Sequence, residues 1–258
     1  MTLDYKNIRI NYTVEGEGSP LILLHGFLEN NAMWLPFVPQ LSNMRKVVCI
    51  ELLGHGQTGC LGYIHSMEDM ADAVFAVINS LKFDTVSCIG HSMGGYVALA
   101  LAEKYPDLID DLCLMNSTFE ADDNERKILR ARAAQMATTN YENLVRMSFV
   151  NLFAPESKEK FKSEIQEALN LGLQTPVQGF IAGHKGMAIR PNRYDAFVNI
   201  KGKKAIVIGK KDWIVNEELL VEKTKNTDTE IVFLSEGHMS HIENKSELSY
   251  FLIRFSEK

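Results

Sequence analysis

Short apolar runs recur along the chain and alternate with stretches in which the apolar residues have helical spacing. The runs cover residues 21–24, 47–50, 86–89, 112–115, 205–208 and 231–234. A continuous apolar run of this length is typical of a parallel strand that is covered on both faces. Helices are predicted at about 34–41, 67–81, 216–224 and 246–255, and another follows the 86–89 run and its turn and is ended by Tyr105-Pro106. An N-terminal hairpin is predicted at 2–5 and 8–14. The alternation predicts an α/β protein with a doubly wound, mostly parallel sheet.

One long segment interrupts this alternation. Residues 120–199 are charged and contain no buried-strand run, and helical patterns cover 123–136 and 157–171. Because the segment is too long for a loop, it is predicted to be an inserted helical cap. The expected domains are therefore a core formed by residues 1–119 and 200–258 and a cap formed by residues 120–199.

Composition narrows the class of protein and its expected partners. Of the 258 residues, 46% are hydrophobic and 23% are charged, which suits a globular domain with a sizeable core. The net charge of −6, with no basic block, argues against nucleic acid and anionic membrane as partners. The N-terminus has no apolar signal segment, and no apolar run approaches the roughly 20 residues of a membrane span. A cytoplasmic protein that acts on a small molecule is expected, with its oligomeric state left open.

The four cysteines support the same compartment. Cys49, Cys60, Cys88 and Cys113 form no C-x-x-C pair, and three of them lie in apolar strand-like runs. They are expected to be reduced and to pack as small hydrophobic side chains. A catalytic thiol is the alternative, although none of them sits at a turn beside a base.

The strongest chemical signal is Gly90-His91-Ser92-Met93-Gly94, which lies between a predicted strand and a predicted helix. A serine between two glycines at such a turn is a nucleophile elbow. The glycines allow strand and helix to approach closely, and the following helix directs its N-terminal N–H groups at a developing oxyanion. Ser92 is therefore the candidate nucleophile. The alternative is a plain turn residue in a Rossmann-like protein.

A serine hydroxyl needs a base, and the base needs a third group that fixes its tautomer. Asp212 follows the 205–208 run and His238 follows the 231–234 run, so both are expected at the carboxyl ends of neighbouring parallel strands. The chain order Ser92, Asp212, His238 matches the nucleophile-elbow arrangement. An oxyanion hole is expected from the N–H of Met93 and the N–H of Phe27, with Gly26 leaving room for the substrate carbonyl.

These segments together resemble the α/β-hydrolase superfamily. The resemblance rests on His25-Gly26-Phe27, Glu51-Leu52-Leu53-Gly54-His55-Gly56, Gly90 to Gly95, Gly209 to Asp212 and Gly237 to Glu243. It implies an eight-stranded core sheet, a helical cap after the sixth strand, a Ser/Asp/His triad and no cofactor. The motifs are most similar to those of small capped carboxylesterases, enol-lactonases, perhydrolases, carbon–carbon bond hydrolases and a menaquinone-pathway lyase. Glu51 and Leu53 depart from the usual Asp and Pro, which puts the pocket wall at residues 54–58 in doubt.

Several residues near the candidate site have alternative interpretations. Asp212 could cap the following helix, and His241 competes with His238 as the base, although it is expected to pair with Glu243 at the surface. His238-x-x-His241 could suggest zinc, but a loop lacks the helix face and further ligands of such sites, so no metal is expected. His91 is expected to be structural.

An apolar substrate pocket is expected around the candidate nucleophile. The residues assigned to it are His25, Gly26, Trp34, Phe119, Phe149, Phe153, Trp213 and Met239, with Phe27 beside them. The sequence thus predicts a serine hydrolase, carboxylesterase-like, that cleaves an ester or a related small carbonyl compound through an acyl-enzyme. Alternatives are a lyase that uses the same triad, a perhydrolase or haloperoxidase, and a non-catalytic small-molecule receptor.

Overall fold

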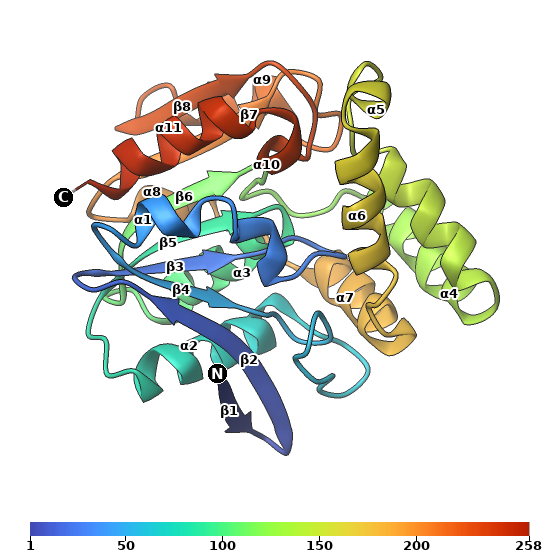
Figure 1. Ribbon diagram of the computed structural model, residues 1–258, viewed down its shortest axis with the longest axis horizontal. Helices are drawn as coiled ribbons and strands as arrows, with labels where there is room; N and C mark the ends of the chain where they lie inside the picture. Colours follow the sequence, from blue (N-terminus) through green and yellow to red (C-terminus); the bar gives the residue numbers. More distant parts are fainter. Residues whose placement is uncertain (258) are drawn as a thin grey trace.

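A mostly parallel sheet of eight strands forms the centre of the protein, as a computed structural model of residues 1–257 shows (Figure 1). The strand order is β1-β2-β4-β3-β5-β6-β7-β8, and all pairs are parallel except β1–β2 and β2–β4. The strands are β1 (Thr2–Tyr5), β2 (Ile8–Glu15), β3 (Pro20–Leu24), β4 (Lys46–Ile50), β5 (Val86–His91), β6 (Ile109–Met115), β7 (Lys204–Gly209) and β8 (Thr229–Leu234). The predicted doubly wound sheet and the N-terminal hairpin are confirmed.

Helices cover both faces of the sheet. The helices are η1 (Asn31–Trp34), α1 (Val38–Leu41), α2 (Met67–Ser80), α3 (Met93–Lys104), α4 (Asn124–Val150), α5 (Ser157–Lys160), α6 (Lys162–Gly172), α7 (Val177–Ile189), α8 (Tyr194–Val198), α9 (Glu217–Thr224), α10 (Ser240–Glu243) and α11 (Lys245–Ser256). Alternate strand residues point to opposite faces. Ile22 and Ile206 join the core with α2 and α3, whereas Leu21 and Ala205 join the core with α1 and α11.

Four helices between β6 and β7 stand at the carboxyl end of the strands rather than on a face of the sheet (Figure 1). We call α4, α5, α6 and α7 the cap helices. The next helix, α8, packs against α3, and Phe197 is buried in the core there. The helices that stand clear of the sheet therefore end at α7, earlier than the boundary at residue 199 that the sequence suggested.

Several helices differ in extent from the sequence prediction. The single helix expected at 34–41 is two short ones, η1 and α1, with Pro39 in the first turn of α1. The helix expected at 123–136 continues to Val150 across a non-helical residue, Asn140. No helix within residues 1–257, α4 included, combines the length and apolar character needed to cross a membrane.

A buried arginine connects the amino ends of the strands. Nε of Arg45 donates to Ser19 O at 2.9 Å, Nη1 donates to Ser256 O at 2.9 Å, and Nη2 donates to Pro20 O at 2.9 Å and to Ser87 Oγ at 2.8 Å. Ser87 in turn donates to Asp111 at 2.8 Å. The side chain thus joins β3, β5, β6 and the C-terminal helix at the end of the sheet opposite Ser92.

We predict that Arg45→Met lowers the free energy of unfolding by about 3–5 kcal/mol, because it leaves four oxygen acceptors at this end of the sheet without their donor. Urea unfolding followed by circular dichroism measures the change. Arg146→Met, at an exposed position of α4, is the control and should change the value by less than about 0.5 kcal/mol. Equal effects of the two substitutions would contradict the role given to Arg45.

Candidate active site

Ser92 sits at the turn between β5 and α3 in a backbone conformation that is rare for a residue with a side chain. Its φ is 48° and its ψ is −114°, and such strain persists only where the surroundings fix it. The N–H of Ser92 donates to Met115 O at 2.9 Å, and Ser117 Oγ donates to Ser92 O at 2.7 Å. Gly90 permits the turn, because a Cβ there would lie 2.4 Å from Gly94 O. The local structure is the elbow that the sequence motif predicted.

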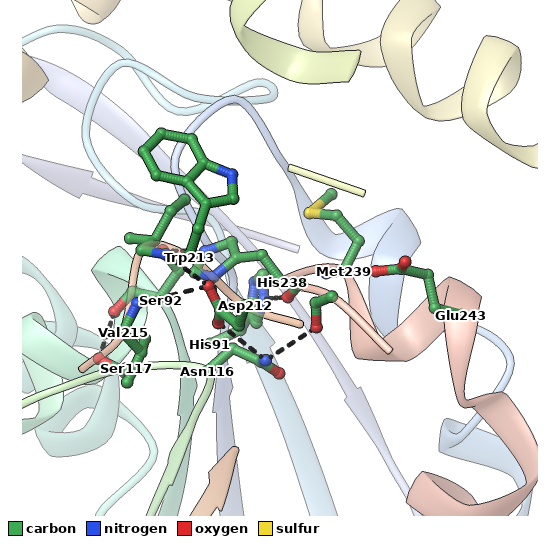
Figure 2. A network of polar contacts seen from close by, with 12 residues as sticks. His91, Ser92, Asn116, Ser117, Asp212, Trp213, Val215, His238, Met239 and Glu243 are labelled. Atoms are coloured by element: carbon green, nitrogen blue, oxygen red, sulfur yellow. Dashed lines mark hydrogen bonds and ion pairs between the residues drawn. The ribbon is translucent and has the colours of Figure 1, made fainter. Parts of the chain in front are cut away.

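Three side chains form a continuous line of hydrogen bonds at this turn (Figure 2). Nε2 of His238 lies 2.9 Å from Ser92 Oγ, and Nδ1 of His238 lies 2.7 Å from Asp212 Oδ2. Asp212 and His238 are buried, and Ser92 is partly exposed. The carboxylate accepts the Nδ1–H, so Nε2 is left as the acceptor for the hydroxyl proton. The structure therefore brings together the three residues that the sequence identified.

Asn116, which directly follows β6, fixes the carboxylate of Asp212. Its Nδ2 donates to Asp212 Oδ2 at 3.1 Å, and the N–H of Ile214 donates to Asp212 Oδ1 at 2.9 Å. Burial raises the pKa of Asp212, but the charge and hydrogen bond of His238, with these donors, outweigh it and lower the pKa. The sequence analysis missed Asn116. Its position at the end of the strand between β5 and β7 was the available signal.

A second buried ionic group lies behind His238. Nδ1 of His91 is 2.7 Å from Glu29 Oε2, and Nε2 of His91 is 3.0 Å from the backbone oxygen of His238. Both neighbours accept hydrogen bonds, so both ring nitrogens carry protons and His91 is a cation. Burial lowers the pKa of His91, but the charge and hydrogen bond of Glu29 outweigh it and raise the pKa. His91 is thus structural, as expected, and it holds the backbone of His238.

Glu29 is ionised in this group. Burial raises its pKa, but the charges of His91 and His241 and the His91 hydrogen bond hold the pKa at about 2. The N–H of Gly26 also donates to Glu29 Oε2, at 2.5 Å. His241 lies 3.6 Å from Glu29 Oε1 and is buried, so the prediction of a surface pair with Glu243 was wrong.

Glu243 accepts instead from the N–H groups of Ala154 and Met239, at 2.8 and 3.0 Å. Its carboxylate therefore connects the loop after α4 with the turn that carries His238. His241 contacts the Glu29 group from the same turn. The two side chains have separate structural roles, which the spacing along the chain did not distinguish.

The histidine-rich part of the site contains side chains of the types that bind metal ions. Within the described residues, Glu29, His91 and His241 offer ligand atoms within 4.8 Å of one another. Both ring nitrogens of His91 are engaged by protein acceptors, so this group is a hydrogen-bonded support rather than an open coordination site. Both ring nitrogens of His238 are also hydrogen-bonded, Nδ1 to Asp212 and Nε2 to Ser92, so neither is available to bind a metal ion together with His241.

The loop after β3 approaches Ser92 from the other side. A Cβ on Gly26 would lie 3.2 Å from Ser92 Cβ and 2.5 Å from Glu29 Oε2. Close packing of this loop on protein atoms is therefore enough to require glycine at position 26. His25 is buried, donates from Nδ1 to Gly26 O at 2.8 Å and accepts from Leu52 N at 3.0 Å. Neither residue lines the cavity, which corrects their assignment to the pocket.

A cavity of about 160 Å³ opens beside Ser92 and His238. Of the residues expected in the pocket wall, Phe149 and Met239 line it, together with Phe27. Tyr96, Arg130, Leu152, His184, Met187 and Ile214 also line it. Arg130, His184 and Met187 come from the cap helices and Leu152 from the loop between α4 and α5, and the docking of the cap cannot be derived from periodicity.

Four aromatic residues assigned to the pocket lie elsewhere. Trp34 is fully buried between the sheet and α11, and Phe119 is buried against Tyr194 and Phe197. Phe153 packs behind Phe149 in the cap core. Trp213 is 67% exposed, and its Nε1 donates to Asn151 O at 2.7 Å (Figure 2).

Glu51, where the sequence departs from the superfamily pattern, organises the adjacent loop. Its carboxylate accepts from Asn11 Nδ2 at 2.9 Å and from Gln57 N at 2.6 Å. Gly54 of that loop lies against α7, since a Cβ on it would be 2.7 Å from Gly179 Cα. The substituted residue is therefore structural and supports the wall on which α7 rests.

The four cysteines and His55 lie outside the line of hydrogen bonds that contains Ser92, and each has a structural role. All four cysteines are free, and Cys49, Cys88 and Cys113 are buried in strands. Burial raises the pKa of each of these thiols. Nδ1 of His55 donates to Leu53 O at 3.0 Å and so fixes its own loop.

The Glu29 carboxylate makes the stability of the protein depend on pH. Its pKa is lowered on folding from 4.5 to about 2, so its stabilising effect is present above pH 4.5 and is lost as the pH falls toward 2. We predict that Glu29→Gln lowers the free energy of unfolding by about 3 kcal/mol at pH 7 and that the difference from wild type narrows below pH 4.5. Urea unfolding at pH 7, 5, 4 and 3 measures it.

The matched control is Glu142→Gln, at an exposed position of α4. This substitution should leave the free energy of unfolding nearly unchanged across the same pH series. A deficit of Glu29→Gln that stays constant from pH 7 to pH 3 would show that the ionised carboxylate is not the source of the stabilisation.

Comparison with known proteins agrees with the fold. The family model described as alpha/beta hydrolase fold matches residues 19–245. The chain is 24% identical over 250 residues, 93% of its length, to the (E)-2-((N-methylformamido)methylene)succinate hydrolase of Acinetobacter baylyi, of which 92% is covered.

Solved structures show the same architecture. A thermophilic esterase from Thermogutta terrifontis superposes with a TM-score of 0.90 at 25% identity, over 99% of this chain and 97% of that one. The enol-lactonase of Burkholderia xenovorans superposes with a TM-score of 0.90 at 20% identity, over 99% of both chains, and so shows the fold alone. The protein belongs to the alpha/beta hydrolase fold family.

Proposed function

We propose that the protein is a serine hydrolase that cleaves an ester or a related small carbonyl compound. The observation that carries the proposal is the line of hydrogen bonds from Asp212 through His238 to Ser92, at 2.7 and 2.9 Å. Ser92 is the nucleophile, His238 is the general base and then the general acid, and Asp212 fixes the imidazole tautomer and stabilises its cation. The names of two relatives, the hydrolase of Acinetobacter baylyi and the esterase of Thermogutta terrifontis, support this reaction class.

The oxyanion hole in this proposal is formed by the N–H groups of Met93 and Phe27. Met93 is the first residue of α3, so its N–H has no acceptor within the helix and lies at the positive end of the helix dipole. The loop that carries Phe27 lies against Ser92, as the short approach of Gly26 indicates. Two donors on opposite sides of the serine suit the charge of a tetrahedral intermediate.

The reaction proceeds in two halves. Ser92 Oγ attacks the carbonyl carbon while its proton passes to Nε2 of His238, and the leaving alcohol then takes that proton as the acyl–oxygen bond breaks. Water attacks the acyl-enzyme with His238 again as base, and the acid leaves with Ser92 regenerated. The cavity of about 160 Å³ beside Ser92 suits a short acyl group, which favours a carboxylesterase-like activity.

We predict that Ser92→Ala lowers kcat for 4-nitrophenyl acetate by on the order of a thousandfold or more, because no other hydroxyl is bonded to His238. Release of nitrophenolate measures turnover, and labelling by a fluorophosphonate probe should disappear with the hydroxyl. Wild-type rates in the variant would refute the mechanism. Labelling of wild type without hydrolysis of any ester would instead favour a lyase, and bromination that needs peroxide and acetate would favour a perhydrolase.

We also predict that Asp212→Asn lowers kcat by on the order of a thousandfold to ten-thousandfold. The amide can donate to Nδ1 of His238, which favours the tautomer with its proton on Nε2, so that Nε2 can no longer accept the proton of the Ser92 hydroxyl. The fluorophosphonate labelling rate of Ser92 should fall in parallel. Asp228→Asn, which changes an exposed carboxylate that pairs with the buried Lys204 away from the site, is the control and should keep the wild-type rate. Full activity of Asp212→Asn would show that another group orients His238.

A further inference from the structure

One arginine lies in the wall of the cavity beside Ser92. Arg130 of α4 lines this cavity together with Met187 of α7 and Tyr96 of α3. Nη1 of Arg130 donates to Sδ of Met187 at 3.3 Å, and a thioether is a weak acceptor. Arg130 therefore has a donor beside the reaction space that the protein itself uses only weakly.

The charges around Arg130 do not cancel. Asp122 is fully buried and is shared by two guanidinium groups, since Arg130 Nε bonds its Oδ2 and Arg190 Nη1 lies 2.8 Å from its Oδ1. Burial raises the pKa of Asp122, but the hydrogen bonds and charges of both arginines outweigh it and lower the pKa, so Asp122 is ionised. Two positive charges and one negative charge leave an excess of one positive charge.

Of the two arginines, Arg130 is the one that faces the cavity. The Arg190 guanidinium stacks on the ring of Tyr96 at 3.9 Å, and its side chain is almost fully buried. His184, another lining residue, does not add a charge, because burial and then the charge of Arg130 lower its pKa to about 3. Glu29 does not neutralise Arg130, because it is paired with His91.

A larger cavity of about 420 Å³ adjoins the first and shares Leu28, Glu29, Phe149 and Met239 with it. Its wall is mainly apolar. Besides Glu29, which is paired with His91, its charged side chains are the carboxylates Glu164 and Glu167 of α6 and the single cation Lys245 of α11, so negative charge predominates. These carboxylates disfavour an anion in the larger cavity, whereas Arg130 favours one in the smaller. The two cavities therefore discriminate between the two ends of an ester.

We propose that the preferred substrates are half-esters of short dicarboxylic acids, with the free carboxylate on Arg130, the ester carbonyl at Ser92 and an apolar alcohol part in the larger cavity. This proposal rests on the proposed function. Hydrolysis breaks the bond between the acyl carbon and the ester oxygen. Water supplies a hydroxyl to the acyl carbon and a proton to the alcohol, and the products are the dicarboxylate and the free alcohol.

The test compares monobenzyl glutarate with benzyl 5-methylhexanoate, in which an isopropyl group replaces the carboxylate. Benzyl alcohol release by wild type should give a kcat/KM at least about tenfold higher for the half-ester, since a charge-assisted hydrogen bond is worth that much or more. The ratio of the two kcat/KM values should fall at least about tenfold in Arg130→Gln and much less in Arg130→Lys. Arg132→Gln, an exposed position of the same helix, should keep the wild-type ratio.

The outcomes separate the two proposals. A wild-type enzyme that hydrolyses the neutral ester as well as or better than the half-ester overturns the substrate class and leaves the serine mechanism standing. Hydrolysis of neither ester overturns both. Arg130→Gln could fail to fold because Asp122 loses a partner. In that case the ratio of kcat/KM for the half-ester to kcat/KM for the neutral ester, measured for wild type and for Arg130→Lys, decides whether the substrate class is correct. A ratio that is unchanged in folded Arg130→Gln also overturns the assignment of the carboxylate to Arg130.

Discussion

The parallel register of β5, β6, β7 and β8 is the constraint on which the site depends. His91 pairs with Met115, Met115 pairs with Val207, and Val207 pairs with Val232, so the last residues of β5 and β6 lie level with Val207 and Val232, and β7 and β8 continue beyond them to Gly209 and Leu234. Ser92 and Asn116 directly follow their strands, whereas Asp212 and His238 lie farther beyond theirs, on turns that reach over the edge toward Ser92. A slip of one residue in any pair would turn the side chains to the opposite face and separate these groups.

Buried charges at this edge occur in compensated groups, because an isolated ion in the interior costs several kcal/mol. Asp212 faces His238 and Asn116, and Glu29 faces His91. The Glu29–His91 pair ends on the backbone oxygen of His238. His238 is thus held through its ring by Asp212 and through its backbone by His91. These two contacts fix the orientation of its imidazole, although His238 lies on a turn. Asp122 and its two arginines are the exception, since their charges do not sum to zero.

The sequence was informative where a functional side chain follows an apolar strand. Such a strand is a continuous apolar run, so its end is visible in the sequence. Ser92 directly follows β5, and Asp212 and His238 lie on the turns after β7 and β8, although β8 itself is only partly buried. Asn116 directly follows β6, but a search for a base and an acid at strand ends passes over an amide that donates to Asp212. The pocket was less predictable, because an aromatic residue such as Trp34 or Phe153 can pack into a core on either side of its element.

Residues of the cap illustrate a further limit. Arg130 and His184 lie on different helices, α4 and α7, and meet only because these helices pack together. The long α4 has no sharp apolar stripe; it buries Ala134, Ala137, Val145 and Phe149 and is otherwise largely polar. Its rotation about its own axis, and hence the direction of Arg130, is set by tertiary contacts that periodicity does not encode.

Hydrogen bonds join the cap to the turns that carry Asp212 and His238. The N–H of His238 donates to Leu152 O at 3.0 Å, and Trp213, next to Asp212, donates to Asn151 O at 2.7 Å. The turns that carry Asp212 and His238 are therefore bonded to the loop that follows α4. Because α4 also carries Arg130, the group that would bind the far end of a substrate and the groups that would attack its carbonyl are positioned by one connected set of hydrogen bonds. The separation between the two ends of a substrate is thereby built into the docking of the cap.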